Sequence, residues 1–148
     1  KGDGLIEIDR LRIWDYYLLY PNKMNNIKLT RKEKDIKKVI KNFIYSEDNP
    51  YEIILNDRKM FEKIKHYQMA AIKCLASYGI INKNYLSENK ISNISRDIFD
   101  NYEDDFKNLS VKEENAIKLL TSHFYQMSLF GKDGLKNRTG LLESKYDA

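Results

Sequence analysis

The sequence predicts a mainly α protein, a compact helical domain with at most a short β-hairpin. Three observations predict this class. Several segments repeat apolar residues at the three- and four-residue spacing of a buried helix face. Two Ser/Thr-x-x-Glu boxes mark helix starts, and little of the chain alternates polar and apolar residues as a strand does. With 148 residues, 42% of them hydrophobic, the chain has the material for one domain with its own core.

The first expected helix covers Leu5 to Tyr20. Leu11, Trp14 and Leu18 recur at helical spacing along it, and a second apolar edge runs beside them. Pro21 follows directly and cannot continue the helix. The pattern predicts a helix that meets solvent on one side only.

The second expected helix begins at a capping box formed by Thr30 and Glu33. Its apolar residues fall at i, i+3, i+4, i+7 and i+8: Ile36, Val39, Ile40, Phe43 and Ile44. The Ser46 to Pro50 segment has turn composition. The β-branched and aromatic run from Tyr51 to Leu55 is ambiguous between strand and helix.

The third expected helix starts at Asp57 and ends at Tyr78, with Gly79 as a left-handed residue after its end. Its inward side chains are expected to be Phe61, Ile64, Ala71, Ile72, Leu75 and Tyr78. One or two short strands are expected within Lys90 to Ser95. Helices followed by a short strand pair are the order of a winged-helix unit, which predicts such a unit over residues 57–95. Periodicity alone does not distinguish this arrangement from a plain helical bundle, which is the alternative.

The last part of the chain combines an acidic amphipathic segment, a helix and a tail. The acidic segment spans Arg96 to Phe106. Ser110 and Glu113 form a second capping box, and the helix they start is expected to run as far as Gly131. The tail beyond has several glycines and no helical period, so it predicts a shaped loop. We expect one domain over residues 1–148, made of N-terminal helices (1–56), the winged-helix-like unit (57–95) and a C-terminal helix with its glycine-rich tail (96–148).

The sequence offers no recognisable catalytic or metal-binding pattern. Its two histidines and one cysteine stand far apart, which does not match a zinc site. The GxxxxGK[ST] phosphate loop and the GxSxG nucleophile motif are both absent. A hydrolase or nuclease would need acids and a lysine brought together from distant segments. We therefore predict that the chain is not an enzyme and has no catalytic residues, metal site or cofactor.

The charge distribution points to an anionic partner. The formal net charge is +4, and the excess of basic residues lies in the first half of the chain. Candidate contacts to a DNA backbone are Arg31, Lys34, Lys37, Lys38 and Lys41. The alternative is a solvated helix face in a lysine-rich protein.

Three segments, taken in order, resemble a known family. They are Asp9 to Pro21, Gln68 to Ile81 and Gly134 to Leu141. Together they resemble a middle component of the bacterial three-component ABC systems (ABC-3C). This group includes the small accessory subunit of Lamassu anti-phage defence.

The resemblance implies a small, winged-helix-like adaptor without activity of its own. It would couple an SMC-like ABC ATPase that senses DNA to an effector, often a nuclease. The protein would bind DNA non-specifically and as part of the complex. The candidate wing, Asn89 to Ser95, is short and carries only Lys90 as a base. A free-standing winged-helix DNA-binding regulator is the alternative. No apolar run is long enough for a bilayer, so we expect no membrane partner. The one cysteine, Cys74, is typical of a reduced intracellular protein, so we expect a cytoplasmic location.

Two groups of residues are candidate partner contacts. The first is the tyrosine cluster Tyr16, Tyr17 and Tyr20, since tyrosine is favoured where an apolar ring is buried and its hydroxyl stays polar. The second is in the tail: Leu135, Lys136, Arg138 and Thr139. The alternative for the tail is that it closes the core of the protein itself.

Overall fold

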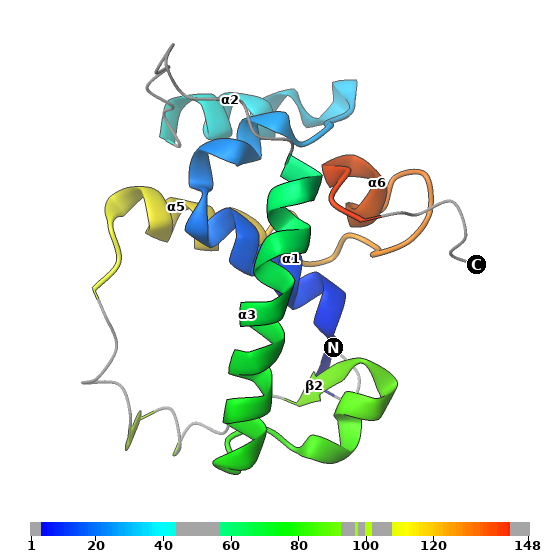
Figure 1. Cartoon of the computed structure of the whole chain (residues 1–148). Coiled ribbons are helices and arrows are strands. Elements are labelled where there is room, and N and C mark those ends of the chain that lie inside the picture. Colours follow the sequence, from blue (N-terminus) through cyan, green and yellow to red (C-terminus); the bar gives the residue numbers. More distant parts are fainter. Residues whose placement is uncertain (1–3, 44–56, 93–96, 98–99, 102–107, 143–148) are drawn as a thin grey trace. The chain divides into compact units, whose positions relative to one another are not determined.

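Figure 1 shows the computed structural model, which describes residues 4–43, 57–92, 97, 100–101 and 108–142. The chain divides into two compact units, each built from segments distant in sequence. The smaller unit contains residues 1–12 and 64–108, and the larger unit contains residues 13–63 and 109–148.

The smaller unit holds a two-stranded antiparallel pair. Strand β1 (Leu5–Glu7) pairs with β2 (Lys90–Ser92), with Ile6 opposite Ile91. The amide of Ile8, the first residue of helix α1 (Ile8–Leu19), donates to the Asn89 carbonyl at 2.8 Å and extends the pairing. Residues 5–8 are therefore held against a segment more than eighty residues later.

The smaller unit is closed by the second half of helix α3 (Asp57–Ser77) and a short 3-10 helix, η3 (Lys83–Glu88). Its buried core residues are Ile8, Ile72, Ile81 and Ile91. A Schellman arrangement ends α3: Gly79 has φ +74°, and the Ile80 amide donates to the Leu75 carbonyl at 2.9 Å. Ile80 and Ile81 are thereby turned back toward the unit's own core.

In the larger unit, α1 ends before the 3-10 helix η1 (Pro21–Asn26), and the 3-10 turn η2 (Arg31–Glu33) leads into helix α2 (Lys34–Phe43). Tyr16 and Phe61 are fully buried in its core, with ring centroids 5.8 Å apart and nearly perpendicular planes. Edge-to-face packing of this kind is favourable for aromatic pairs.

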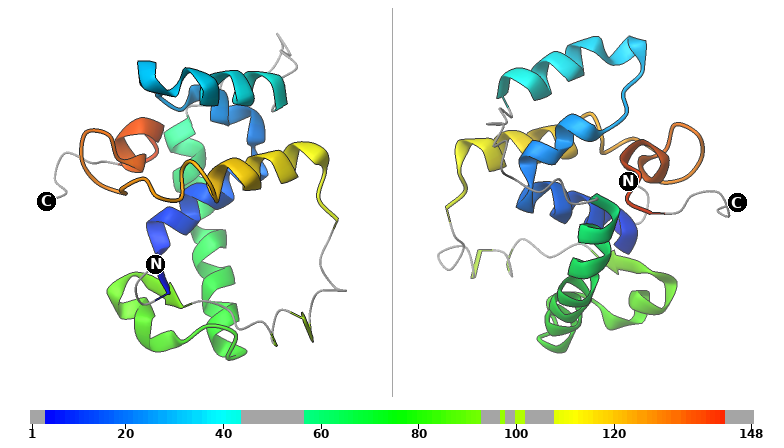
Figure 2. Two further views of the ribbon diagram at one scale, coloured as in Figure 1. Left: turned by 180° about the vertical axis from the view of Figure 1, so that it is seen from behind. Right: turned by 45° about the horizontal axis from the view of Figure 1, so that its top comes forward.

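The end of the larger unit is helix α5 (Val111–Leu120), a loop, and the short helix α6 (Leu135–Thr139). The loop between them curls around α6 (Figure 2). The amides of Leu135 and Lys136 donate to the carbonyls of Ser128 and Leu129 at 2.8 and 3.1 Å. The loop is thus bonded to the helix that follows it. Leu135 and Leu141 are both buried.

The mainly α class is confirmed, as are both capping boxes and the left-handed Gly79. Other expectations were wrong in detail. Residues 5–7 form a strand instead of the first turn of a helix, because they pair with β2. Helix α5 stops at Leu120 and does not reach Gly131. The Thr121 amide still donates to the Ile117 carbonyl, four residues back, but the Ser122 amide donates to the Leu119 carbonyl, three residues back, at 3.3 Å. The Thr121 hydroxyl also donates to the Ile117 carbonyl, at 2.7 Å, a bond that Ser and Thr side chains often form with helix backbone.

For the third helix, the expected set of buried side chains was wrong at two positions. Ala71 is exposed and Tyr78 is 76% exposed, although both were expected to face the core. The tail, expected to be a loop without helix, contains α6.

Several expectations lie outside the described residues. They concern the Ser46–Pro50 turn, the Tyr51–Leu55 run, most of the Arg96–Phe106 segment and the wing beyond Ser92. The single-domain subdivision and the winged-helix arrangement stay predictions. Across the described residues, no helix is both long and apolar enough to cross a bilayer.

Candidate functional site: a buried charge network and an exposed basic face

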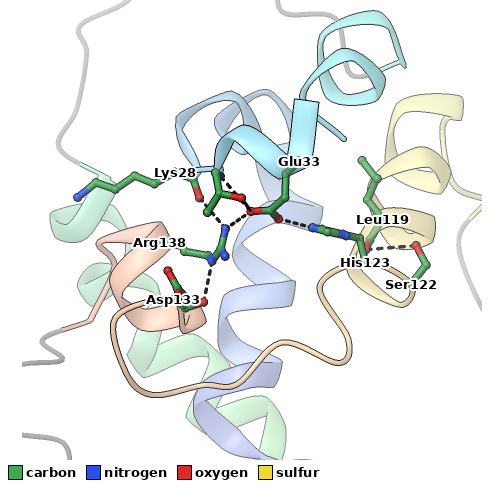
Figure 3. Close-up of polar contacts among 8 residues, drawn as sticks. Lys28, Glu33, Leu119, Ser122, His123, Asp133 and Arg138 are labelled. Carbon is green, nitrogen blue, oxygen red and sulfur yellow. Dashed lines mark hydrogen bonds and ion pairs between the residues drawn. The ribbon is translucent and has the colours of Figure 1, made fainter. Parts of the chain in front are cut away.

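A buried charge network joins three segments of the larger unit around one carboxylate, that of Glu33 (Figure 3). The Thr30–Glu33 capping box returns this carboxylate to the start of its own helix, where Oε1 accepts the Thr30 amide at 3.0 Å. The Thr30 hydroxyl donates to the same oxygen at 2.9 Å. The local sequence therefore fixes where the carboxylate points.

Arg138, on α6, is the cation of this network. Its Nη1 lies 2.5 Å from Glu33 Oε1, and the two side chains are 11% and 10% exposed. The same guanidinium donates from Nε to the Asp133 carbonyl at 2.6 Å and from Nη1 to the Lys28 carbonyl at 3.3 Å. The Lys28 amide in turn donates to the Arg138 carbonyl at 2.9 Å. Arg138 therefore ties α6 to the segment before η2.

His123, just past the end of α5, reaches Glu33 from the other side. Its Nε2 contacts Glu33 Oε2, the oxygen that Arg138 leaves open (Figure 3). The imidazole is 28% exposed and packs edge-on against the buried ring of Phe124, with centroids 5.0 Å apart. One carboxylate thus links η2, the turn after α5, and α6.

The network stabilises the ionised form of Glu33. Burial opposes ionisation, but hydrogen bonds from the Thr30 amide, His123 and Arg138 outweigh it and lower the pKa of Glu33 to about 2, from 4.5. A carboxyl with a lower pKa in the folded state contributes stability above its unfolded pKa and loses it as the pH falls toward the folded value.

We therefore expect the protein to lose stability between about pH 4.5 and pH 2 through this residue, by about 3 kcal/mol in total. Urea unfolding at several pH values would measure it. The Glu33→Gln variant, less stable at pH 7, should show a flatter pH dependence across the same window. An unchanged slope in that variant would contradict the assignment.

The predicted DNA-backbone residues gather on one exposed face. Lys34, Lys37 and Lys38 lie on α2 at i, i+3 and i+4, and Lys41 continues the row at i+7. Arg31, in η2, stands one turn earlier. All five are exposed, and none forms an ion pair with another described residue. We call this set the basic face.

The predicted partner contacts are placed differently. Tyr16 and Tyr17 are 0% and 2% exposed, and Leu135 and Lys136 are also buried. Tyr20 and Thr139 are partly exposed to solvent. The role of these residues in partner binding stays a prediction, and the buried ones contribute to the core of the larger unit.

The burial of Tyr16 has a polar explanation. Its hydroxyl donates to Asp57 Oδ1 at 2.7 Å, and Asn26 donates to Oδ2 at 3.0 Å. Burial, together with Asp57, raises the pKa of Tyr16 above its ordinary value. Like Glu33, Asp57 therefore links segments that are distant in sequence: the start of α3, helix α1 and η1.

The described residues bring together no group of three or more His, Cys, Asp or Glu side chains able to hold a metal ion. His123 and Arg138 each bond the Glu33 carboxylate, and Glu33 and Arg138 also bond backbone groups, an arrangement suited to holding segments in place.

In a comparison with protein families, a family model matches residues 1–147 of the chain. The matching model is the ABC-three component (ABC-3C) system Middle Component 5. This chain belongs to that family. As a middle component of an ABC-3C system it has an adaptor-like, accessory role beside the other components of the system. No curated protein and no solved structure matches the chain.

Sequence reasoning did not foresee the wider role of Glu33 in this middle component. The capping box identified its local bond to Thr30, but His123 and Arg138 lie 90 and 105 residues away. A residue that caps one helix carries no sequence signal for partners at that distance.

Proposed function

We propose that the protein is a non-catalytic adaptor that bridges an SMC-like ABC ATPase and an effector nuclease in an anti-phage or anti-plasmid defence complex of the Lamassu type. The observation that carries the proposal is the match to a middle-component family over residues 1–147. The lack of a metal-binding cluster among the described residues is compatible with such a role.

Copurification tests the bridge. The tagged chain, expressed with the ATPase and effector encoded beside it, should recover both, and the effector should lose the ATPase when the chain is omitted. The chain alone should hydrolyse neither DNA nor ATP. Recovery of an intact ATPase–effector complex without the chain would overturn the bridging role.

Within this complex, the basic face supplies contacts to the DNA backbone. Arg31, Lys34, Lys37, Lys38 and Lys41 are exposed and unpaired among the described residues, so they are free to exchange counterions for phosphates. The face offers lysine point charges on one side of a helix, which suits phosphate contact better than base reading. Such binding is weak, salt-sensitive and independent of sequence.

We expect reversal of Lys34, Lys37 and Lys38 to Glu to lower DNA affinity on every sequence alike. If each lysine contacts one phosphate, the slope of log affinity against log salt falls by about 2 to 3, at about 0.9 per contact. Fluorescence anisotropy with two unrelated duplexes at several salt concentrations would measure both effects.

The matched control reverses three exposed lysines of α3: Lys59, Lys65 and Lys73. It changes the net charge equally but leaves the basic face intact. An equal loss of affinity in the control would mean that net charge, not the basic face, governs binding. Tight binding to one sequence at physiological salt would instead favour a free-standing DNA-binding regulator.

A further inference from the structure

The part of α3 that belongs to the smaller unit has an apolar row on its solvent side. Tyr67 is 72% exposed and Tyr78 is 76% exposed, and Ala71 and Cys74 between them are also exposed. Tyr78 follows the last helical residue but keeps the helical register, since its amide donates to the Cys74 carbonyl at 3.1 Å. We call these four residues the α3 seam.

The spacing of the α3 seam is that of a coiled-coil contact. Its members are separated by four, three and four residues, which is the alternation of d and a positions in a heptad. At about 100° per residue, all four lie within about 60° of one another around the helix. The face buried in the protein's own core, which includes Phe61, Gln68 and Ile72, lies on another side of α3.

The order of residues in the seam is symmetric about its midpoint: large, small, small, large. If two copies of the helix run antiparallel, Tyr67 of one faces Tyr78 of the other, and Ala71 faces Cys74. Each pair then joins a d position to an a position, and the two small pairs at the centre let the backbones approach closely. A two-fold interface requires a patch that complements itself in this way.

We infer that the α3 seam is a contact between two copies of this chain, packed antiparallel. The charged side chain nearest the centre of the seam, Lys73, points about 120° away from Tyr67 and does not enter the contact. The seam is only about 16 Å long and buries less than the roughly 1,200 Å² of a standard interface. The dimer is therefore weak, with a Kd in the range of about 10 to 100 μM.

Analytical ultracentrifugation of the full chain tests the contact. The wild type should pass from monomer to dimer as its concentration rises through that range. Ala71→Glu, which places a charge at the centre of the seam, should weaken the dimer about tenfold or more and leave helix content unchanged, because Ala71 is exposed in the monomer. The control Lys73→Glu changes a neighbouring exposed residue outside the seam and should leave the dimer intact.

Disulfide trapping tests the antiparallel register. Cys74 is the one cysteine in the sequence. A tagged Ala71→Cys/Cys74→Ser variant mixed with untagged wild type should form a mixed disulfide dimer under mild oxidation. A tagged Lys73→Cys/Cys74→Ser variant should form much less, because its thiol points away from the seam.

Three results would overturn the inference. One is a wild type that stays monomeric at about 200 μM, well above the expected Kd. Another is equal trapping of both cysteine variants. The third is a dimer unaffected by Ala71→Glu while that variant loses copurification with the ATPase or effector, since the seam would then belong to another component.

Discussion

Replacing Arg138 with alanine is expected to destabilise the protein by about 3 kcal/mol, equivalent to a fall in Tm of about 10 °C for a chain of this length. The guanidinium and the Glu33 carboxylate are both nearly buried, and their ion pair is 2.5 Å long. Removal of the cation leaves a buried carboxylate short of a partner, and the carbonyls of Lys28 and Asp133 lose a donor. Thermal and urea unfolding would measure the loss.

A matched control is Lys132→Ala, which removes an exposed cation from the loop before α6. We expect this variant to be within about 0.5 kcal/mol of wild type. If Arg138→Ala were equally harmless to stability but lost the ATPase or effector in pull-down, Arg138 would be a docking residue and not a structural one. This pair of variants therefore distinguishes the two roles predicted for the tail, which are partner docking and closure of the protein's own core.

A double-mutant cycle would show that the loss comes from the pair. Glu33→Gln alone leaves Arg138 with a neutral acceptor, and Arg138→Ala alone leaves Glu33 with Thr30 and His123. Because the two residues share one bond, the double variant should lose less stability than the sum of the single losses. Additive losses would mean that the residues act independently.

The sequence was most informative where structure depends on near neighbours. The Thr30–Glu33 and Ser110–Glu113 boxes and Gly79 act within a few residues, and each has the predicted conformation. Periodicity likewise identified the main helices. It did not reveal that residues 5–7 form a strand, because their partner lies at residues 90–92 and strand pairing is not a local property.

Periodicity also cannot say which side of a helix is covered. Along α3, the row through Phe61, Gln68 and Ile72 and the row through Tyr67, Ala71 and Cys74 both have helical spacing. The structure buries the first row and exposes the second. The incorrect inward assignment of Ala71 and Tyr78 has this cause, and the same exposed row forms the proposed α3 seam.

For the candidate site, the sequence predicted the shared face of the α2 lysines, but it did not predict the burial of Tyr16, Tyr17, Leu135 and Lys136. Lysines at i, i+3, i+4 and i+7 of α2 share a face whatever surrounds them, and the basic face has this arrangement. The carboxylate of Glu33 was assigned only its local bond, because the positions of α5 and α6 depend on the packing of the whole unit. Arg138 was singled out for its chemistry, and its partner within the chain could not be foreseen.

Gly134→Ala is expected to be the most damaging single-methyl change in the tail. A Cβ at this position would lie 2.2 Å from the Phe130 carbonyl oxygen and 2.5 Å from its carbon. Both are backbone atoms, so no side chain can move aside to make room. The loop that curls around α6 must therefore shift. This shift disturbs the hydrogen bonds from the Leu135 and Lys136 amides to the loop carbonyls. We expect a loss of about 3 kcal/mol or more in urea unfolding.

The other tail glycines provide the control for this prediction. Gly131 and Gly140 have φ of +90° and +67°, but a Cβ at either position would meet nothing within 4 Å. Alanine there costs only the strain of a left-handed backbone, about 1 to 2 kcal/mol. Gly134 has φ −80°, which any residue adopts, so its need for glycine comes from close approach alone. Gly134→Ala should therefore be the least stable of the three variants; a smaller loss than for Gly140→Ala would show that the loop does not pack this closely around α6 in solution.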